Sequence, residues 1–246
     1  MSSGWSYSYT LPQAPRPKGV STSRHELRDL AIAYVVLTFD LILIFSGSTF
    51  LFGVGATGLV YALTPGILAV AATAGFTGFV AHELAHKIVA ERRGFWAEFR
   101  MSPAGLALSF FTALVGFLWG APGATVVSGM SEYDRADWGK TSVAGPLTNV
   151  AFGVAFLAAG IGTSAWNAGV STGLLLLAWI NGWFGTFNLI PFGPLDGRKV
   201  LRWNVGAWLG AIVFTGAVAG VSILSLYSMY SYGTPFHYFA ALGVGP

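Results

Sequence analysis

The sequence predicts an all-α polytopic membrane protein with about five to six transmembrane helices, each needing about 20 apolar residues. Of its 246 residues, 54% are apolar and only 9% are charged, and the mean hydropathy is +0.64. A soluble domain normally carries about 25% charged residues, so this composition excludes an ordinary soluble globule. The 33 glycines are too scattered for collagen and suit closely packed transmembrane helices. The net charge of +3 is too small to favour nucleic-acid binding.

Six apolar runs divide the chain, and each is near the length needed to cross a bilayer: 30–52, 66–90, 104–122, 142–161, 171–191 and 205–230. Residues 1–29 are rich in Ser, Tyr, Pro and basic residues and predict a disordered cytoplasmic tail. The connections between runs are too short for a separate soluble domain. We therefore expect one transmembrane domain over residues 30–232, followed by a short C-terminal tail over residues 233–246.

The distribution of basic residues indicates that the third run is re-entrant. If all six runs cross, five of the 13 bases fall outside the cell, which violates the positive-inside rule: Arg135, Lys140, Arg198, Lys199 and Arg202. If run 104–122 dips into the membrane and returns, every Lys and Arg lies in the cytoplasm. The Pro and Gly residues that bracket this run favour the same arrangement, which requires a surrounding cavity. An ordinary buried helix with a weaker charge bias remains the alternative.

The second run contains His82-Glu83-Leu84-Ala85-His86, an H-E-x-x-H pattern. Residues four apart share one helix face, so both imidazoles can bind one metal ion. Glu83 lies beside that face, where it can take a proton from activated water. The alternative is a polar cluster that reaches the lipid headgroups beside Lys87.

A third metal ligand must come from another part of the chain, because catalytic zinc usually takes three protein ligands. The chain has no cysteine, which leaves His, Asp and Glu as ligands. The other acids at membrane depth are Asp40 and Asp196. Asp196 ends a helix-breaking segment with two prolines and two glycines, residues 188–197, and is the better candidate. Alternatively, it pairs with Arg198 or Arg202 at the membrane surface.

These motifs resemble those of the site-two proteases, a family of intramembrane zinc metalloproteases. The resemblance rests on His82 to His86, on Leu195-Asp196-Gly197 and on Ala144-Gly145-Pro146-Leu147-Thr148-Asn149, which is similar to the family's A-G-P-x-x-N motif. It implies a three-helix core over residues about 66–202 and a membrane-associated β-hairpin within residues 99–127. The chain has room for neither a PDZ nor a CBS domain, so we expect a compact form.

The resemblance also implies the roles of individual residues. His82, His86 and Asp196 would bind one Zn²⁺ per chain, and Glu83 would be the general base. Asn188 and Asn149 match family asparagines that support the substrate or the oxyanion, although such amides often only join neighbouring helices.

The function that we predict is hydrolysis of peptide bonds in or near transmembrane segments of membrane-anchored substrates. We expect an integral protein of a prokaryotic cell membrane, with its N-terminus and active site towards the cytoplasm. Its partners would be a transmembrane protein and the lipid bilayer. A divalent-metal transporter using the same His/Asp cluster is the alternative, although the chain lacks the internal repeat typical of transporters. A non-catalytic membrane scaffold would not explain His82, Glu83 and His86.

Overall fold

The computed structural model describes residues 20–46, 64–131 and 133–229. Their elements follow in order: α1 (Arg24–Phe45), α3 (Pro65–Gly75), η1 (Phe76–Val80), α4 (Ala81–Arg92), β1 (Trp96–Met101), α5 (Pro103–Ala113), β2 (Gly123–Ser128), α6 (Arg135–Thr163), α7 (Ala168–Asn188), α8 (Asp196–Trp203) and α9 (Val205–Met229). The α3, η1 and α4 segments form one continuous helix, in which η1 is a π-helical turn.

Four helices in the described part are long and apolar enough to cross a membrane: Pro65–Arg92, α6, α7 and α9. α1 has 22 residues and therefore also has the length, although it carries several charged side chains. The fold class is thus confirmed as an all-α polytopic membrane protein. The only sheet in these ranges is the small one formed by β1 and β2.

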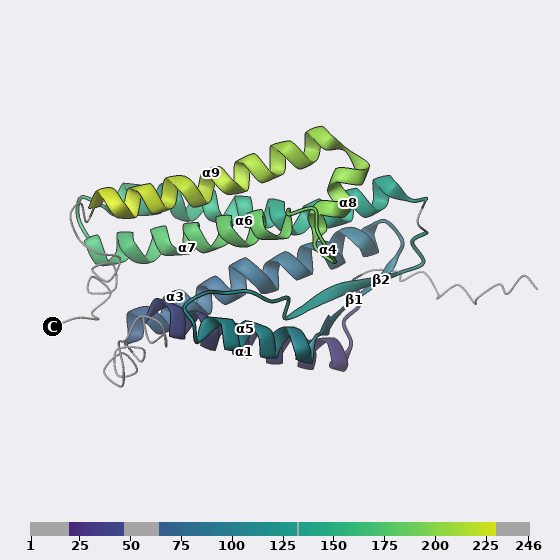
Figure 1. Ribbon diagram of the computed structural model, residues 1–246, viewed down its shortest axis with the longest axis horizontal. Helices are drawn as coiled ribbons and strands as arrows, with labels where there is room; N and C mark the ends of the chain where they lie inside the picture. Colours follow the sequence, from purple (N-terminus) through teal and green to yellow (C-terminus); the bar gives the residue numbers. More distant parts are fainter. Residues whose placement is uncertain (1–19, 47–63, 132, 230–246) are drawn as a thin grey trace, which may run out of the picture.

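The helices form two groups that share α4 (Figure 1). α6, α7 and α9 pack side by side in one group, and α1, α3 and α5 lie in the other. The larger apolar core joins the groups and contains Leu37, Leu41, Ile67 and Leu175. α4 packs on both α6 and β1, so its side chains lie in the middle of the molecule. The hairpin and α8 lie at one end of the bundle.

Run 104–122 is re-entrant, as the charges predicted. β1 pairs with β2 in antiparallel register, from Trp96 opposite Ser128 to Met101 opposite Gly123, so the chain leaves and returns at one end. Between the strands, α5 has 11 residues and spans roughly 16 Å at 1.5 Å per residue, about half of a bilayer core. α5 is therefore too short to cross by itself, which counts against the alternative of an ordinary helix with a weaker charge bias.

The predicted boundary of the N-terminal tail is wrong, because α1 begins at Arg24 and includes residues 24–29. Ser23 caps this helix by accepting a hydrogen bond from the Glu26 N–H at 3.1 Å. Glu26 and Asp29 are buried against β1, a tertiary contact that local composition does not reveal. The tail before residue 20, the end of the first run and the tail over residues 233–246 lie outside the described residues.

Candidate metal centre

Two imidazoles face each other on α4, directly after the π-helical turn. His82 and His86 are 2% and 6% exposed, and their Nε2 atoms lie 3.0 Å apart. The rings are nearly perpendicular, at 85°. Single π-turns within α-helices are often found at functional sites, because they shift which side chains share a face.

Asp196 joins the two histidines from the first residue of α8. Its Oδ2 atom lies 3.0 Å from His86 Nε2 and 3.4 Å from His82 Nε2. Ligands of tetrahedral zinc, bound at about 2.0–2.1 Å, are separated by about 3.3–3.4 Å. These three residues form the group in the described ranges that could hold a metal ion.

The surroundings of Asp196 keep it ionised, as a metal ligand requires. Burial alone would raise the pKa of this carboxyl, but His86 and His82 hold the pKa well below its usual range. Its other oxygen lies 3.6 Å from Lys199 Nζ. Among the described residues, no ion pair joins Asp196 to Arg198 or Arg202, so this alternative is not supported.

Hydrogen bonds to the far sides of the imidazoles fix their tautomers. Nδ1 of His82 lies 2.5 Å from Asn149 Oδ1, and Nδ1 of His86 lies 2.7 Å from the carbonyl oxygen of Thr141. Because both partners are acceptors, each Nδ1 carries a proton, and the Nε2 atom of each ring is the one available to a metal. The two Nε2 atoms and the Asp196 carboxylate oxygen converge, so a cation can take the place of the imidazole protons that face Asp196.

Gly145 on α6 leaves the space that such a cation needs. A Cβ atom at this position would lie 2.5 Å from the Nε2 atoms of both His82 and His86. The glycine therefore keeps one side of the site open at the closest approach of α4 and α6. Pro146 follows directly inside α6 and has no N–H to donate to the Ser142 carbonyl, which loosens the helix next to Thr141, whose carbonyl accepts from His86.

Glu83 lies beside the histidines and is held by β2. Both the backbone N–H and the hydroxyl of Thr125 donate to Glu83 Oε2, at 2.9 and 2.8 Å. Glu83 lines two small cavities of about 50 and 60 Å³, one of which also contacts His82 and the other His86 and Asp196. Each cavity is large enough for water.

Asn188, the last residue of α7, lines both of these cavities. Its amide nitrogen donates to the Phe184 carbonyl at 3.0 Å. Asn149 lies differently: it is fully buried, and its amide nitrogen donates to the Gly78 carbonyl at 3.0 Å and to Asn181 Oδ1 at 3.3 Å. Its amide therefore connects His82 with η1 and α7.

Asp40, which the sequence left without a role, is not part of the metal group. It is buried in α1, and its Oδ2 accepts a hydrogen bond from Ser109 of α5 at 2.8 Å. This contact joins the first helix to the re-entrant helix.

The sequence did not predict the roles of four residues at this site. They are Thr125, Thr141, Asn181, and Gly145, which leaves space beside the histidines. Asn181 could have been found, because an amide in the middle of an apolar run needs a partner. The Thr141 contact uses a backbone carbonyl, which every residue has, so no side-chain pattern marks it.

Comparison with known proteins identifies the family of the chain. The model of peptidase family M50 matches residues 95–230, more than half of the chain. A protein of Methanocaldococcus jannaschii described as a putative zinc metalloprotease is 34% identical over 219 residues, which cover 85% of this chain and 96% of that protein. The chain belongs to peptidase family M50.

This family is that of the site-two proteases, which the motifs resembled. A protein of Mycobacterium tuberculosis described as the putative zinc metalloprotease Rip3 is 33% identical over 129 residues, or 50% of this chain and 28% of Rip3. No solved structure matches the chain. The M50 assignment makes the protein a zinc metalloprotease, and the buried His-His-Asp group provides a donor set that fits zinc.

The buried Asn149 leads to a test of zinc binding. Replacing Asn149 with leucine should lower the affinity for zinc roughly 10- to 100-fold, because His82 loses the acceptor that orients its ring. The affinity is measured by competition with a fluorescent chelator. Thr148→Val is the control, since the Thr148 hydroxyl bonds only within its own helix, to the Ala144 carbonyl at 3.0 Å. Equal affinities in both variants would contradict an orienting role.

Proposed function

We propose that this zinc metalloprotease cleaves peptide bonds in or near transmembrane segments of membrane-anchored proteins. One observation carries the proposal: the His82, His86 and Asp196 group lies buried on a helix that is long and apolar enough to cross the membrane, next to the re-entrant hairpin. Buried ionisable groups at membrane depth are costly and usually functional. A peptide bond is brought to this site most directly by a substrate that is itself in the membrane.

The positions of the side chains support the proposed roles. His82, His86 and Asp196 would hold zinc through Nε2, Nε2 and Oδ2. When bound, zinc supplies Lewis-acid activation of water and of the scissile carbonyl. Glu83 accepts the proton of the attacking water in the adjoining cavities and passes it to the leaving amine. Thr125 holds the Glu83 carboxylate in place for this transfer.

The outer edge of β2 is the proposed docking site for the substrate backbone. In an antiparallel pair, alternate residues direct their N–H and C=O groups away from the partner strand. The Thr125 N–H points outwards to Glu83, so the outward positions of β2 face the catalytic helix. The cavity that contains Asp196 also contacts Thr125 and Val127. A substrate strand added along this edge would be unwound and close to the zinc site.

The two asparagines have different proposed roles. Asn188 lines the cavities on either side of Glu83 and is placed to donate to the oxyanion that forms during attack. The amide of Asn149 is used by His82, Gly78 and Asn181. We therefore assign Asn149 to positioning His82, in place of the substrate contact expected from the sequence.

The proposed orientation places the zinc site towards the cytoplasm. Basic residues follow α4, begin α6 and lie on α8, and an Arg93–Asp137 ion pair joins the end of α4 to the start of α6. Short cytoplasmic segments favour such residues. The relatives from an archaeon and a bacterium support a prokaryotic cell membrane. Within it, the chain would form one protease domain built around residues 66–202.

The test uses the purified protein in liposomes, together with a substrate that has one transmembrane helix and a terminal reporter. We expect reporter release that stops when a chelator removes zinc and resumes when zinc is restored. A trapped zinc indicator reports metal flux in the same vesicles. Zinc flux without cleavage would favour the transporter and contradict the proposal. Cleavage of an unfolded soluble reporter alone would retain the protease but contradict a membrane substrate.

A further inference from the structure

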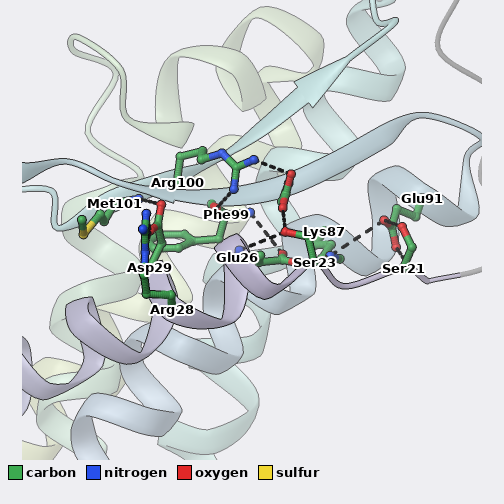
Figure 2. A network of polar contacts seen from close by, with 11 residues as sticks. Ser21, Ser23, Glu26, Arg28, Asp29, Lys87, Glu91, Phe99, Arg100 and Met101 are labelled. Atoms are coloured by element: carbon green, nitrogen blue, oxygen red, sulfur yellow. Dashed lines mark hydrogen bonds and ion pairs between the residues drawn. The ribbon is translucent and has the colours of Figure 1, made fainter.

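The outer edge of β1 is covered by side chains of α1. The backbone N–H groups of Phe99 and Met101 point away from β2 and donate to carboxylates, to Glu26 Oε1 at 3.1 Å and to Asp29 Oδ2 at 3.4 Å. The two acids lie three residues apart on one helix face, and the two donors lie two residues apart along the strand. Figure 2 shows Glu26 and Asp29 beside the strand that carries Phe99 and Met101.

Glu26 also connects this edge to the catalytic helix. Its second carboxylate oxygen forms an ion pair with Lys87, which directly follows the zinc-binding His86. Glu26 and Lys87 are each 1% exposed, and Glu91 lies 3.9 Å from Lys87 Nζ on its other side. Burying these charges is tolerable only because they are paired, so the geometry of this contact is tightly fixed.

A second contact strengthens the joint between α1 and β1. The hydroxyl of Ser23, the residue that caps α1, donates to Glu98 Oε1 on β1. Arg100 Nη2 donates to the other oxygen of Glu98 at 2.6 Å. Glu26 occupies the position of a capping-box glutamate, but its side chain is used for β1 and Lys87. At the start of α1, the Glu26 side chain therefore bonds to β1 and to Lys87 instead of capping its own helix.

We propose that α1 is a brace for the substrate-binding strand: Glu26 and Asp29 occupy the outer edge of β1, which leaves a substrate only the β2 edge, where Glu83 accepts from the Thr125 N–H, and Lys87 fixes the distance of that edge from the zinc ligands. The proposal rests on the proposed function, in which the substrate adds to β2. Glu26, Asp29 and Lys87 are positioning residues, since they act through the hairpin. The covered edge also prevents pairing at the wrong side of the sheet.

The hydrogen bonds of the brace are tested by removing or retaining its acceptors. The double variant Glu26→Ala/Asp29→Ala loses both, whereas Asp29→Asn keeps a side-chain oxygen at position 29 and leaves the Glu26–Lys87 ion pair intact. Asp137→Asn is the matched control, since it disrupts an ion pair to the residue after α4 without contact to the hairpin. Lys87→Met combined with Glu26→Gln removes both members of the buried ion pair, leaves Glu91 its hydrogen bonds from Ser21, and tests the link to α4.

Two measurements are made on each protein. The chain has no cysteine, so cysteines introduced at Val126 on β2 and Arg92 on α4 carry spin labels without background. We expect a narrow distance distribution in the wild type, Asp29→Asn and Asp137→Asn, and a broadened or shifted one in the alanine double variant and in Lys87→Met/Glu26→Gln. We also expect kcat/KM for the membrane-anchored substrate to fall roughly tenfold or more in those two, mainly through KM, with zinc content unchanged.

The outcomes separate the brace from the proposed function. An unchanged label distance in the alanine double variant would overturn the brace. A changed distance with unchanged kcat/KM would overturn its link to substrate binding. If no protein cleaves the substrate, the proposed function fails, and the label distances still decide whether α1 positions the hairpin.

Discussion

Replacing Glu83 with glutamine should lower the rate of substrate cleavage about 10²- to 10⁴-fold, the contribution typical of a general base. Glutamine has the shape of glutamate but cannot accept the proton of water at neutral pH. Both Thr125 donors bond to the same oxygen of Glu83, so the amide oxygen of glutamine can take its place and the fold should be retained. The rate is measured with purified protein in detergent, and bound zinc is counted by elemental analysis.

The zinc content distinguishes loss of the base from loss of the site. We expect Glu83→Gln to keep one zinc per chain, because its carboxylate is not in the group formed by His82, His86 and Asp196. Asp134→Asn removes a half-buried carboxylate that accepts hydrogen bonds from Ser131, and it serves as the control with an unchanged rate. Equal cleavage by the wild type and Glu83→Gln would mean that Glu83 is not the base or that a contaminating protease is active.

Replacing Gly145 with alanine should remove both zinc and activity. The new methyl group would lie 2.5 Å from the Nε2 atoms of His82 and His86, which is closer than real Cβ contacts. The rings cannot easily turn away, because Asn149 and Thr141 hold their Nδ1 atoms. We expect the affinity for zinc to fall at least roughly 100-fold, the upper range for disturbing residues around a metal site. Competition with a chelator measures this affinity.

Two other glycines on α6 are matched controls for Gly145→Ala. A Cβ atom at Gly162 would meet nothing within 4 Å, so Gly162→Ala controls for helix propensity. A Cβ atom at Gly160 would lie 2.9 Å from Leu175 Cδ2, so Gly160→Ala adds a packing clash with a residue that is not part of the site. Loss of zinc in Gly160→Ala as well would indicate general disruption of the helix bundle. Full zinc binding by Gly145→Ala would contradict the proposed position of the metal.

Several features of this protein follow from the sequence alone because their causes are local. Helical periodicity places His82 and His86 on one face, and the structure finds them 3.0 Å apart at Nε2. The re-entrant segment was predicted from the distribution of Lys and Arg, because the positive-inside rule applies to each short loop by itself. The start of α1 at Arg24 was not predicted, because the composition of this segment does not reveal that it packs against a strand far along the chain.

The tertiary structure decided how the site is held and aligned. Asn149 meets His82 across 67 residues of chain, Thr125 meets Glu83 across 42, and Glu26 meets Phe99 across 73. The sequence marked Asn149 and Glu83 by motif, but it could not indicate their partners. Periodicity describes one element at a time, whereas a hydrogen bond between elements depends on how the helices and the hairpin pack. The sequence therefore indicated the zinc protease class and the membrane fold. The packing of α1, α4, α6 and β2 determined which groups contact the proposed zinc ligands, the proposed base and the proposed substrate edge.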